Sequence, residues 1–234
     1  MSFLCRVLRK ERLRSLPSLD TCALVTFLNP YSYLLARKNS ELFERFDRVY
    51  PDGVILAKAL GVIGLPSKRL SFDMTSLAPV VFRECLDRGV SLAVIGSELG
   101  VAEKAVAVWK TKFGRQLDVV YVRNGFFSNS SDVDDCYRDI SSSGARVVIV
   151  GMGTPVQEQF LVGLVDSGWR GVGFTCGGFL HQTASKGQTY YPLWIDKLNL
   201  RWLYRMFDEP KLIKRYLMNY PIFIFAFVSD LFRR

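Results

Sequence analysis

Histidine is almost absent from this chain, because its 234 residues contain only His181. Sites with several histidine ligands are therefore excluded, and a Ser-His-Asp hydrolase is disfavoured. Cysteines are also few, odd in number and widely separated, and they are Cys5, Cys22, Cys85, Cys136 and Cys176. Without a Cys-x-x-Cys pair they indicate neither a disulfide framework nor a zinc site, and they fit a reducing cytosol.

Long apolar runs are missing as well. The most apolar segment, residues 221–228, is far shorter than the roughly 20 residues that cross a bilayer. The basic stretch at residues 6–14 is followed by a short polar segment instead of the apolar core of a secretory signal. We therefore expect neither export nor a membrane-spanning helix.

The composition that remains is that of a folded, basic protein. Hydrophobic residues make up 49% of the chain and charged residues 23%, which favours one compact domain with an appendage. The formal net charge is +9 and the pI is near 9.4, so part of the surface favours an anionic partner. Nucleic acid, phospholipid headgroups and phosphorylated ligands all satisfy that condition.

Short apolar runs alternate with segments of helical period up to about residue 190. This rhythm predicts an α/β fold with a Rossmann-like, mainly parallel sheet flanked by helices. The expected strands are 23–28, 48–50, 91–95, 118–122, 146–150 and 171–175. The expected helices are 31–46, 54–60, 76–88, 101–113, 133–142 and 157–167.

The pattern changes after residue 190, where aromatics mix with cations. Between Asp196 and Arg234 there are eight Lys or Arg against four acids. Such a segment can lie in a lipid headgroup layer, whereas the alternative is an ordinary helix pair docked on the sheet. We interpret residues 1–190 as a Rossmann-like catalytic domain and 191–234 as a helical, basic, membrane-associating appendage.

The stretch 147–158 marks the clearest candidate ligand site. An apolar run stops at Gly151 and Gly153, which allow a tight turn and a close backbone approach. Thr154 and Gln157 then have the spacing of a helix cap and its partner. Free N–H groups at such a helix start attract anions such as a nucleotide diphosphate, although a simple capping box is the alternative interpretation.

Polar residues also follow the first two expected strands. Thr26 and Asn29 end the first strand, and Asp52 follows the second, so all three are expected over one edge of the sheet. A carboxylate there can act as a base. Arg69 and Asp73 form a further polar group before a helix. Taken singly, these residues are also typical of turns and helix caps.

Acidic residues at 132–135 have a spacing that can bind a hard cation. They follow a cap-rich loop, however, and acids in the first turn of a helix favour its dipole without any ligand. We therefore predict no metal site and no cofactor.

Together these segments resemble the WecG/TagA/CpsF family of bacterial glycosyltransferases, from about residue 21 to residue 220. The family order is a strand ending in Thr and Asn, then Asp-Gly, Arg-x-x-x-x-Asp and Gly-x-Gly-x-Pro-x-Gln-Glu. The matching residues here are Thr26, Asn29, Asp52, Gly53, Arg69, Asp73, Gly151, Gly153, Gln157 and Glu158. The arginine and aspartate are one residue closer here, and the tail from Trp194 to Tyr216 is similar to the family's closing pattern.

The resemblance implies transfer of a sugar, with inversion and without a required metal, from a UDP-sugar to a polyprenyl-diphosphate-linked saccharide. It implies action on the inner face of the plasma membrane, with an anionic membrane surface as partner and no nucleic acid. Asp52 matches the base, and Arg205 and Arg215 are candidates for stabilising the leaving diphosphate. Substrate contacts are expected from Thr26, Asn29, Arg69, Asp73, Gly151, Gly153, Gln157, Glu158, Gly178 and Gln182.

Residues 71–78 resemble the branch that uses uronic-acid donors, such as UDP-glucuronate or UDP-N-acetylmannosaminuronate. Arg201 or Lys186 would then pair with the donor carboxylate, whereas an N-acetylmannosamine donor needs no such cation.

Two other functions remain as alternatives. An NAD-dependent oxidoreductase lacks support because the first strand leads into Asn29 and not into Gly-x-Gly-x-x-Gly. A nucleic-acid-binding protein lacks a recognisable motif.

Overall fold

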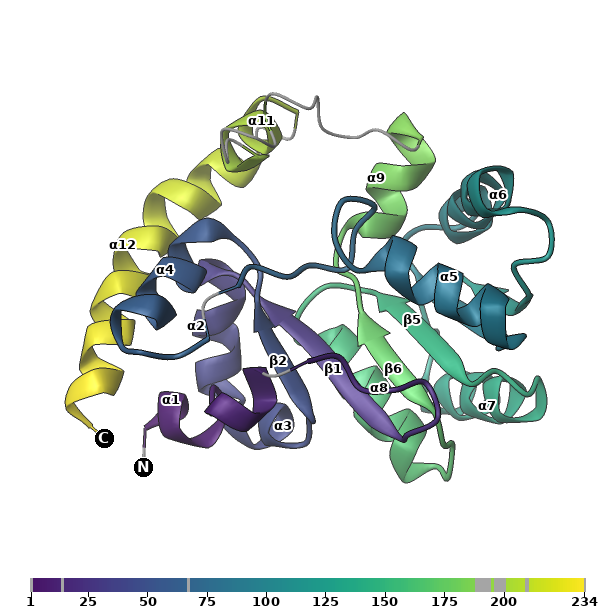
Figure 1. The fold of residues 1–234 in the computed structure, drawn as a ribbon, viewed down its shortest axis with the longest axis horizontal. Helices are drawn as coiled ribbons and strands as arrows, with labels where there is room; N and C mark the ends of the chain where they lie inside the picture. The colour runs from purple at the N-terminus through teal and green to yellow at the C-terminus, as the bar shows by residue number, and fades with distance from the viewer. Residues whose placement is uncertain are drawn as a thin grey trace.

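One six-stranded sheet organises the molecule, in the order β2-β1-β6-β5-β3-β4, and every strand pair in it is parallel (Figure 1). The computed structural model describes residues 2–13, 15–66, 68–187, 195, 201–208 and 211–233. For residues 201, 202, 205, 208, 211, 212, 215 and 216 only the backbone is described. The prediction of a mainly parallel α/β sheet is confirmed.

The strands are β1 (Ala23–Leu28), β2 (Arg48–Pro51), β3 (Leu92–Gly96), β4 (Val119–Arg123), β5 (Val147–Gly151) and β6 (Val172–Thr175). Each lies within one residue of its predicted range. The chain builds β1 and β2 toward one edge and β3 and β4 toward the other, and then fills the centre with β5 and β6. The direction of winding therefore reverses between β3 and β5, and such a reversal leaves a crevice at the carboxyl ends of the strands.

Helices precede, connect and follow the strands. They are α1 (Phe3–Arg6), the 3₁₀ helix η1 (Lys10–Leu13), α2 (Pro30–Lys38), α3 (Ser40–Glu44), α4 (Val54–Val62), α5 (Ala78–Arg88), α6 (Val101–Phe113), α7 (Ser130–Ser142), α8 (Val156–Asp166), α9 (Phe179–Lys186), α11 (Arg201–Asp208) and α12 (Lys211–Phe232). The prediction of one helix over 31–46 is wrong. The helix breaks at Asn39, whose ψ of 40° is not helical and whose side chain donates to the carbonyl of Leu35 at 2.8 Å.

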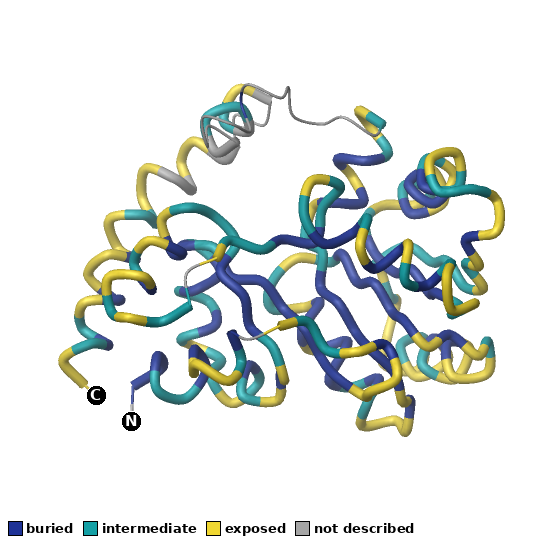
Figure 2. Tube along the Cα trace, viewed as in Figure 1, coloured by how far each residue is buried: buried dark blue, intermediate teal, exposed yellow. Residues whose placement is uncertain are grey.

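Two hydrophobic cores cover the two faces of the sheet. Leu24 and Val148 face the layer that contains α2, α3, α7 and α8. Their chain neighbours Val25 and Ile149 face the layer that contains α5, α6 and α9. Because both faces are covered, the central strands are buried along their length (Figure 2), which explains their continuous apolar sequences.

The long C-terminal helix α12 packs along α2, on the outer side of that helix layer (Figure 1). The rings of Phe223 and Phe227 lie 5.1 Å and 6.0 Å from the ring of Tyr33. The buried Asp230 carboxylate accepts hydrogen bonds from the Tyr33 hydroxyl at 2.7 Å and from Arg37 Nε at 3.0 Å. The C-terminal half of α12 is thus anchored to a helix and not to the sheet. No helix among the described residues is long and apolar enough to span a membrane.

Candidate active site

A buried polar network joins the carboxyl-terminal parts of β1 and β6 to the first turn of α8. The Thr26 hydroxyl donates to Glu158 Oε1 at 2.9 Å, and the Thr175 hydroxyl donates to Thr26 Oγ1 at the same distance. Glu158 Oε1 also accepts from Gln157 Nε2 at 3.0 Å and from the Thr154 hydroxyl at 3.3 Å. One carboxylate oxygen therefore joins β1 to the start of α8, and β6 is connected to it through Thr26.

Gln157 extends this network to the loop after β6. Its Oε1 accepts a hydrogen bond from the backbone N–H of Gly177 at 3.1 Å. Its side chain is thereby fixed in both its donor and its acceptor roles. The turn after β5 and the turn after β6 are consequently held at a set separation.

Glu158 is fully buried, and burial raises the pKa of its carboxyl group above the ordinary range. The hydrogen bonds from Gln157 and Thr26 oppose that shift. Among the described residues, Oε2 of Glu158 has no hydrogen-bond partner. Removal from water outweighs the hydrogen bonds, so the neutral acid is favoured.

The capping box expected at Thr154 and Gln157 is not formed. The N-cap of α8 is Pro155, and no side chain caps this helix start. Thr154 instead donates to Glu158 and accepts from Gln157 Nε2 at 3.3 Å. The prediction of a cap is therefore wrong, because the Thr154 oxygen accepts from the Gln157 side chain and not from a backbone N–H of the helix start.

Glycines let the backbone turns after β3, β5 and β6 approach one another. A Cβ atom on Gly96 would lie 2.3 Å from the carbonyl oxygen of Gly151, and one on Gly151 would lie 2.9 Å from Sγ of Cys176. The N–H of Ser97 donates to the Gly151 carbonyl at 2.9 Å. Gly153 has a φ of +76°, a conformation that favours glycine. The turn after β5 thus has the tight geometry that the glycines predict.

Asp52 directly follows β2, next to the end of β1. Its N–H donates to the carbonyl of Leu28 at 2.7 Å, and its side chain is half-buried. Gly53 follows with a φ of +98° and begins α4. The N–H of Leu70 donates to the carbonyl of Pro51 at 3.0 Å, so the segment with Arg69 and Asp73 is held beside this strand end.

Asp73 organises its own turn. It accepts from the Ser71 hydroxyl at 2.5 Å and from the N–H and hydroxyl of Thr75 at 2.8 Å and 2.6 Å. Arg69 lies 4.0 Å from this carboxylate. The cap role considered for Asp73 is wrong, because α5 begins later, after Leu77.

Asn29 caps the start of α2, which is the structural role that its position suggests. Its side-chain oxygen accepts from the N–H groups of Tyr31 and Ser32 at 3.0 Å, and the Ser32 hydroxyl accepts from the Asn29 N–H. This is a complete capping box at the start of α2. The carboxamide oxygen is therefore already used at the edge where the ligand is expected.

The remaining predicted residues lie farther along the chain. Gly178 is the exposed N-cap of α9, and Gln182 is buried within that helix. Arg205 and Arg215 fall in α11 and α12, but their side chains lie outside the described part of the structure.

The acids near residue 132 have a protein partner. Asp132 accepts from Arg123 at 2.6 Å and from the N–H of Ser128 at 3.0 Å. Across the described ranges, no group of three or more His, Cys, Asp or Glu side chains is arranged to hold a metal ion.

Two members of the network were missed in the sequence, Thr175 and Gly177. Like Thr26, Thr175 is a threonine near the carboxyl end of an expected strand, and it lies on the same face of the sheet, where its hydroxyl donates to Thr26. That positional equivalence was a usable signal. The contact of the Gly177 N–H with Gln157 had no such signal, because it depends on the turn geometry after β6.

An all-parallel sheet between two helix layers, with polar side chains at its carboxyl edge, defines a doubly wound α/β protein of the class that binds ligands at that edge. The sequence profile of the Glycosyl transferase WecG/TagA/CpsF family matches residues 9–234. The chain is also 34% identical over 218 residues to the UDP-Gal:alpha-D-GlcNAc-diphosphoundecaprenol beta-1,4-galactosyltransferase of Shigella boydii, covering 93% of this chain and 90% of that protein. The chain belongs to the WecG/TagA/CpsF family, and it is a glycosyltransferase.

Proposed function

We propose that this enzyme transfers a hexose, with inversion, from a UDP-sugar to a saccharide linked to undecaprenyl diphosphate. Family membership supports glycosyl transfer, and the name of the Shigella boydii relative supports the donor and acceptor classes. The observation that carries the proposal is the position of Asp52, half-buried at the carboxyl edge of the sheet beside β1. Neither the oxidoreductase nor the nucleic-acid alternative gains support from the family match or from this relative.

Inverting transfer needs a base, and Asp52 is assigned that role. The carboxylate removes the proton of the acceptor hydroxyl while this oxygen attacks the anomeric carbon, and the bond from that carbon to the diphosphate oxygen breaks. Arg69, held near this strand end, is assigned to the sugar or its phosphate. The bond of Leu70 to Pro51 supports this assignment, because it keeps the segment near Asp52.

Charge on the leaving UDP must be stabilised. The helix start after Gly151 and Gly153 supplies N–H groups and the positive end of the α8 dipole. Arg205 and Arg215 of the C-terminal helices are assigned to the same diphosphate. The other donor contacts are assigned to residues of the same edge and of α9, namely Thr26, Asn29, Asp73, Gln157, Glu158, Gly178 and Gln182.

The donor sugar is proposed to be galactose, since the Shigella boydii relative is named for UDP-Gal. This differs from the uronic acid suggested by the resemblance of residues 71–78. A uronate donor carries an additional carboxylate that requires a cation, whereas galactose does not. Comparison of the two donors therefore decides between these interpretations.

The proposal includes a membrane-associating role for residues 191–234, on the inner face of the plasma membrane. Residues at steps of three and four place Phe223, Phe227 and Asp230 on the docked face of α12. The opposite face is apolar as well, with Leu217 67%, Phe225 77% and Phe232 86% exposed. An apolar helix face that no described segment covers is suited to the boundary between lipid headgroups and acyl chains.

Transfer is tested with a short-chain lipid carrying GlcNAc on a diphosphate, supplied in detergent without vesicles. Radiolabelled UDP-galactose, UDP-glucuronate and UDP-N-acetylmannosaminuronate are compared as donors. We expect label to reach the lipid from UDP-galactose. Label from a uronate alone would correct the donor, and no transfer from any UDP-sugar by the folded enzyme would contradict the proposed function.

A further inference from the structure

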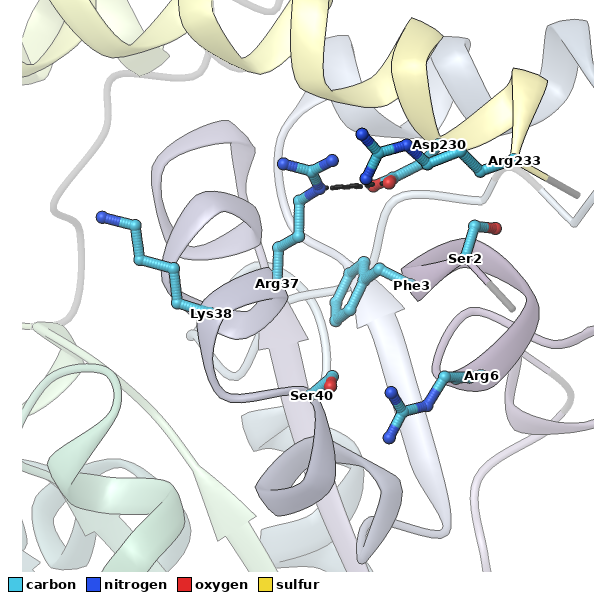
Figure 3. A pocket seen from close by; sticks show the side chains of 8 residues that line it. All are labelled: Ser2, Phe3, Arg6, Arg37, Lys38, Ser40, Asp230 and Arg233. Atoms are coloured by element: carbon cyan, nitrogen blue, oxygen red, sulfur yellow. Dashed lines mark hydrogen bonds and ion pairs between the residues drawn. The ribbon is translucent and has the colours of Figure 1, made fainter.

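A cationic cavity of about 580 Å³ lies between α1, α2 and the C-terminal end of α12 (Figure 3). Its lining includes four basic residues, Arg6, Arg37, Lys38 and Arg233, and one acidic residue, Asp230. None of them belongs to the carboxyl edge of the sheet. The cavity is therefore separate from the proposed catalytic site.

Two of the four cations have structural partners. Arg37 Nε lies 3.0 Å from Oδ2 of the buried Asp230, and Arg6 forms an ion pair with Glu44. Lys38 and Arg233 are exposed, and within the described ranges neither forms an ion pair with a carboxylate. Figure 3 shows Arg233 beside the Arg37–Asp230 pair, whereas Lys38 lies on the other side of Arg37 and points away from the other labelled side chains.

The excess of positive charge in this cavity favours an anionic ligand. Four basic residues and the carboxylate of Asp230 line it, and after the Arg37–Asp230 and Arg6–Glu44 pairs two of these cations, Lys38 and Arg233, remain. Like charges gathered around a hollow repel one another unless an anion enters it. Guanidinium groups match phosphate oxygens particularly well, because they present several N–H donors in one plane.

The location of the cavity indicates where that phosphate would come from. Arg233 directly follows Phe232, whose side chain is 86% exposed on the outward apolar face of α12. A helix of 22 residues is about 33 Å long, so this face extends along the whole side of the molecule that ends at the cavity (Figure 1). A lipid surface in contact with that face brings headgroup phosphates to the cavity rim.

We propose that this cavity binds the phosphate of an anionic phospholipid headgroup when α12 lies on the membrane. The inference rests on the membrane contact in the proposed function and adds a ligand class and a site to it. Arg37 has a second role as the partner of Asp230, whereas Lys38 and Arg233 are available for the headgroup. The same chemistry fits free phosphate, so the test separates the two sources.

The test uses the full-length enzyme with Lys38→Gln and Arg233→Gln combined. The matched control combines Lys104→Gln and Arg115→Gln, which removes the same charge from exposed positions on and just after α6. Binding to vesicles of phosphatidylglycerol with phosphatidylcholine, and of phosphatidylcholine alone, is measured by co-sedimentation at 0.1 M salt. Loss of two membrane-facing cations should weaken binding to the anionic vesicles about tenfold or more, whereas the control should change it less than twofold.

Several outcomes would overturn the proposal. These are equal binding by the two double variants, or equal binding of the unmodified enzyme to both kinds of vesicle. The third outcome combines two results. Inorganic phosphate would raise the melting temperature of the unmodified enzyme but not that of the Lys38/Arg233 double variant, and the two proteins would bind vesicles equally. The ligand of the cavity would then be free phosphate. Sugar transfer to the short-chain acceptor without vesicles should be equal in the unmodified enzyme and in both double variants. If none of them transferred sugar, this result would count against the proposed function and not against the cavity as a headgroup site.

Discussion

The hydroxyl of Thr26 in β1 donates a 2.9 Å hydrogen bond to Glu158 in α8, across 132 positions of sequence. Both side chains are fully buried. This contact ties the helix that follows the glycine turn to the first strand, and Thr175 joins it from β6. The strand ends at the centre of the proposed site are therefore held by one carboxyl group whose pKa is raised by burial.

Glu158→Gln should flatten the pH dependence of stability. Burial raises the pKa of Glu158, so the folded state binds a proton that the unfolded chain, with a pKa of about 4.3, has released. The stabilisation is complete below the unfolded pKa and is lost as pH rises to the folded pKa, by up to about 1.4 kcal/mol per pH unit. Glutamine keeps the acceptor for Thr26 and has no charge to bury.

The measurement is urea unfolding at pH 5, 6, 7 and 8. Glu103→Gln, at an exposed position in α6, is the control and should keep the slope of the unmodified protein. An unchanged slope in Glu158→Gln would show that this carboxyl group is ionised in the fold.

Gly96→Ala should destabilise the protein by about 2–4 kcal/mol, more than its backbone angle alone explains. Its Cβ would lie 2.3 Å from the Gly151 carbonyl oxygen, so β3 and β5 would have to separate at the reversal point. Gly168→Ala is a matched control, because Gly168 also has a positive φ, +105°, but its Cβ would meet no atom within 4 Å. Urea unfolding gives both values, and equal losses would mean that the close approach has no cost.

Much of the fold was predictable because the four central strands, β1, β6, β5 and β3, are buried on both faces. Runs such as Val147–Gly151 are continuously apolar, and flanking glycines mark their ends. Helix boundaries were harder to predict where a polar side chain could bond either to the backbone or to another side chain. Asn39 interrupts an amphipathic helical pattern, because its side chain donates to the backbone carbonyl of Leu35. Thr154 does not cap α8, and its hydroxyl donates to the side chain of Glu158.

The site was predictable in position and less so in its contacts. Parallel strands bring their carboxyl ends to one edge, so Thr26 and Asp52 were expected there. The raised pKa of Glu158 was not foreseeable, because it depends on complete burial by residues from three elements. The packing of α12 on α2 could not be predicted from the sequence either, because Phe223 and Phe227 are equally compatible with a membrane-facing surface.

Asp230→Ala should loosen the C-terminal helix. It removes the buried acceptor of Tyr33 and the partner of Arg37, and breaking such a pair costs roughly 3–5 kcal/mol, reduced here because Arg37 is 32% exposed. We expect a loss of about 2–3 kcal/mol in urea unfolding and faster tryptic cleavage within α12. Asp134→Ala, an exposed position in α7, should change neither quantity. Equal cleavage rates in the two variants would show that Phe223 and Phe227 anchor the helix without this carboxylate.

Asp52→Asn should abolish most of the transfer activity while leaving donor binding intact. An amide cannot accept the proton of the acceptor hydroxyl, and loss of a general base typically lowers kcat by about 10²–10⁴-fold. The half-buried position at the end of β2 tolerates the isosteric amide, so the far-UV circular dichroism and the KM for the UDP-sugar should stay close to those of the unmodified enzyme. Asp87→Asn, at an exposed position in α5, serves as the control and should retain full kcat. Because the fold and the donor site are preserved in this comparison, undiminished transfer by Asp52→Asn would assign the base to another residue.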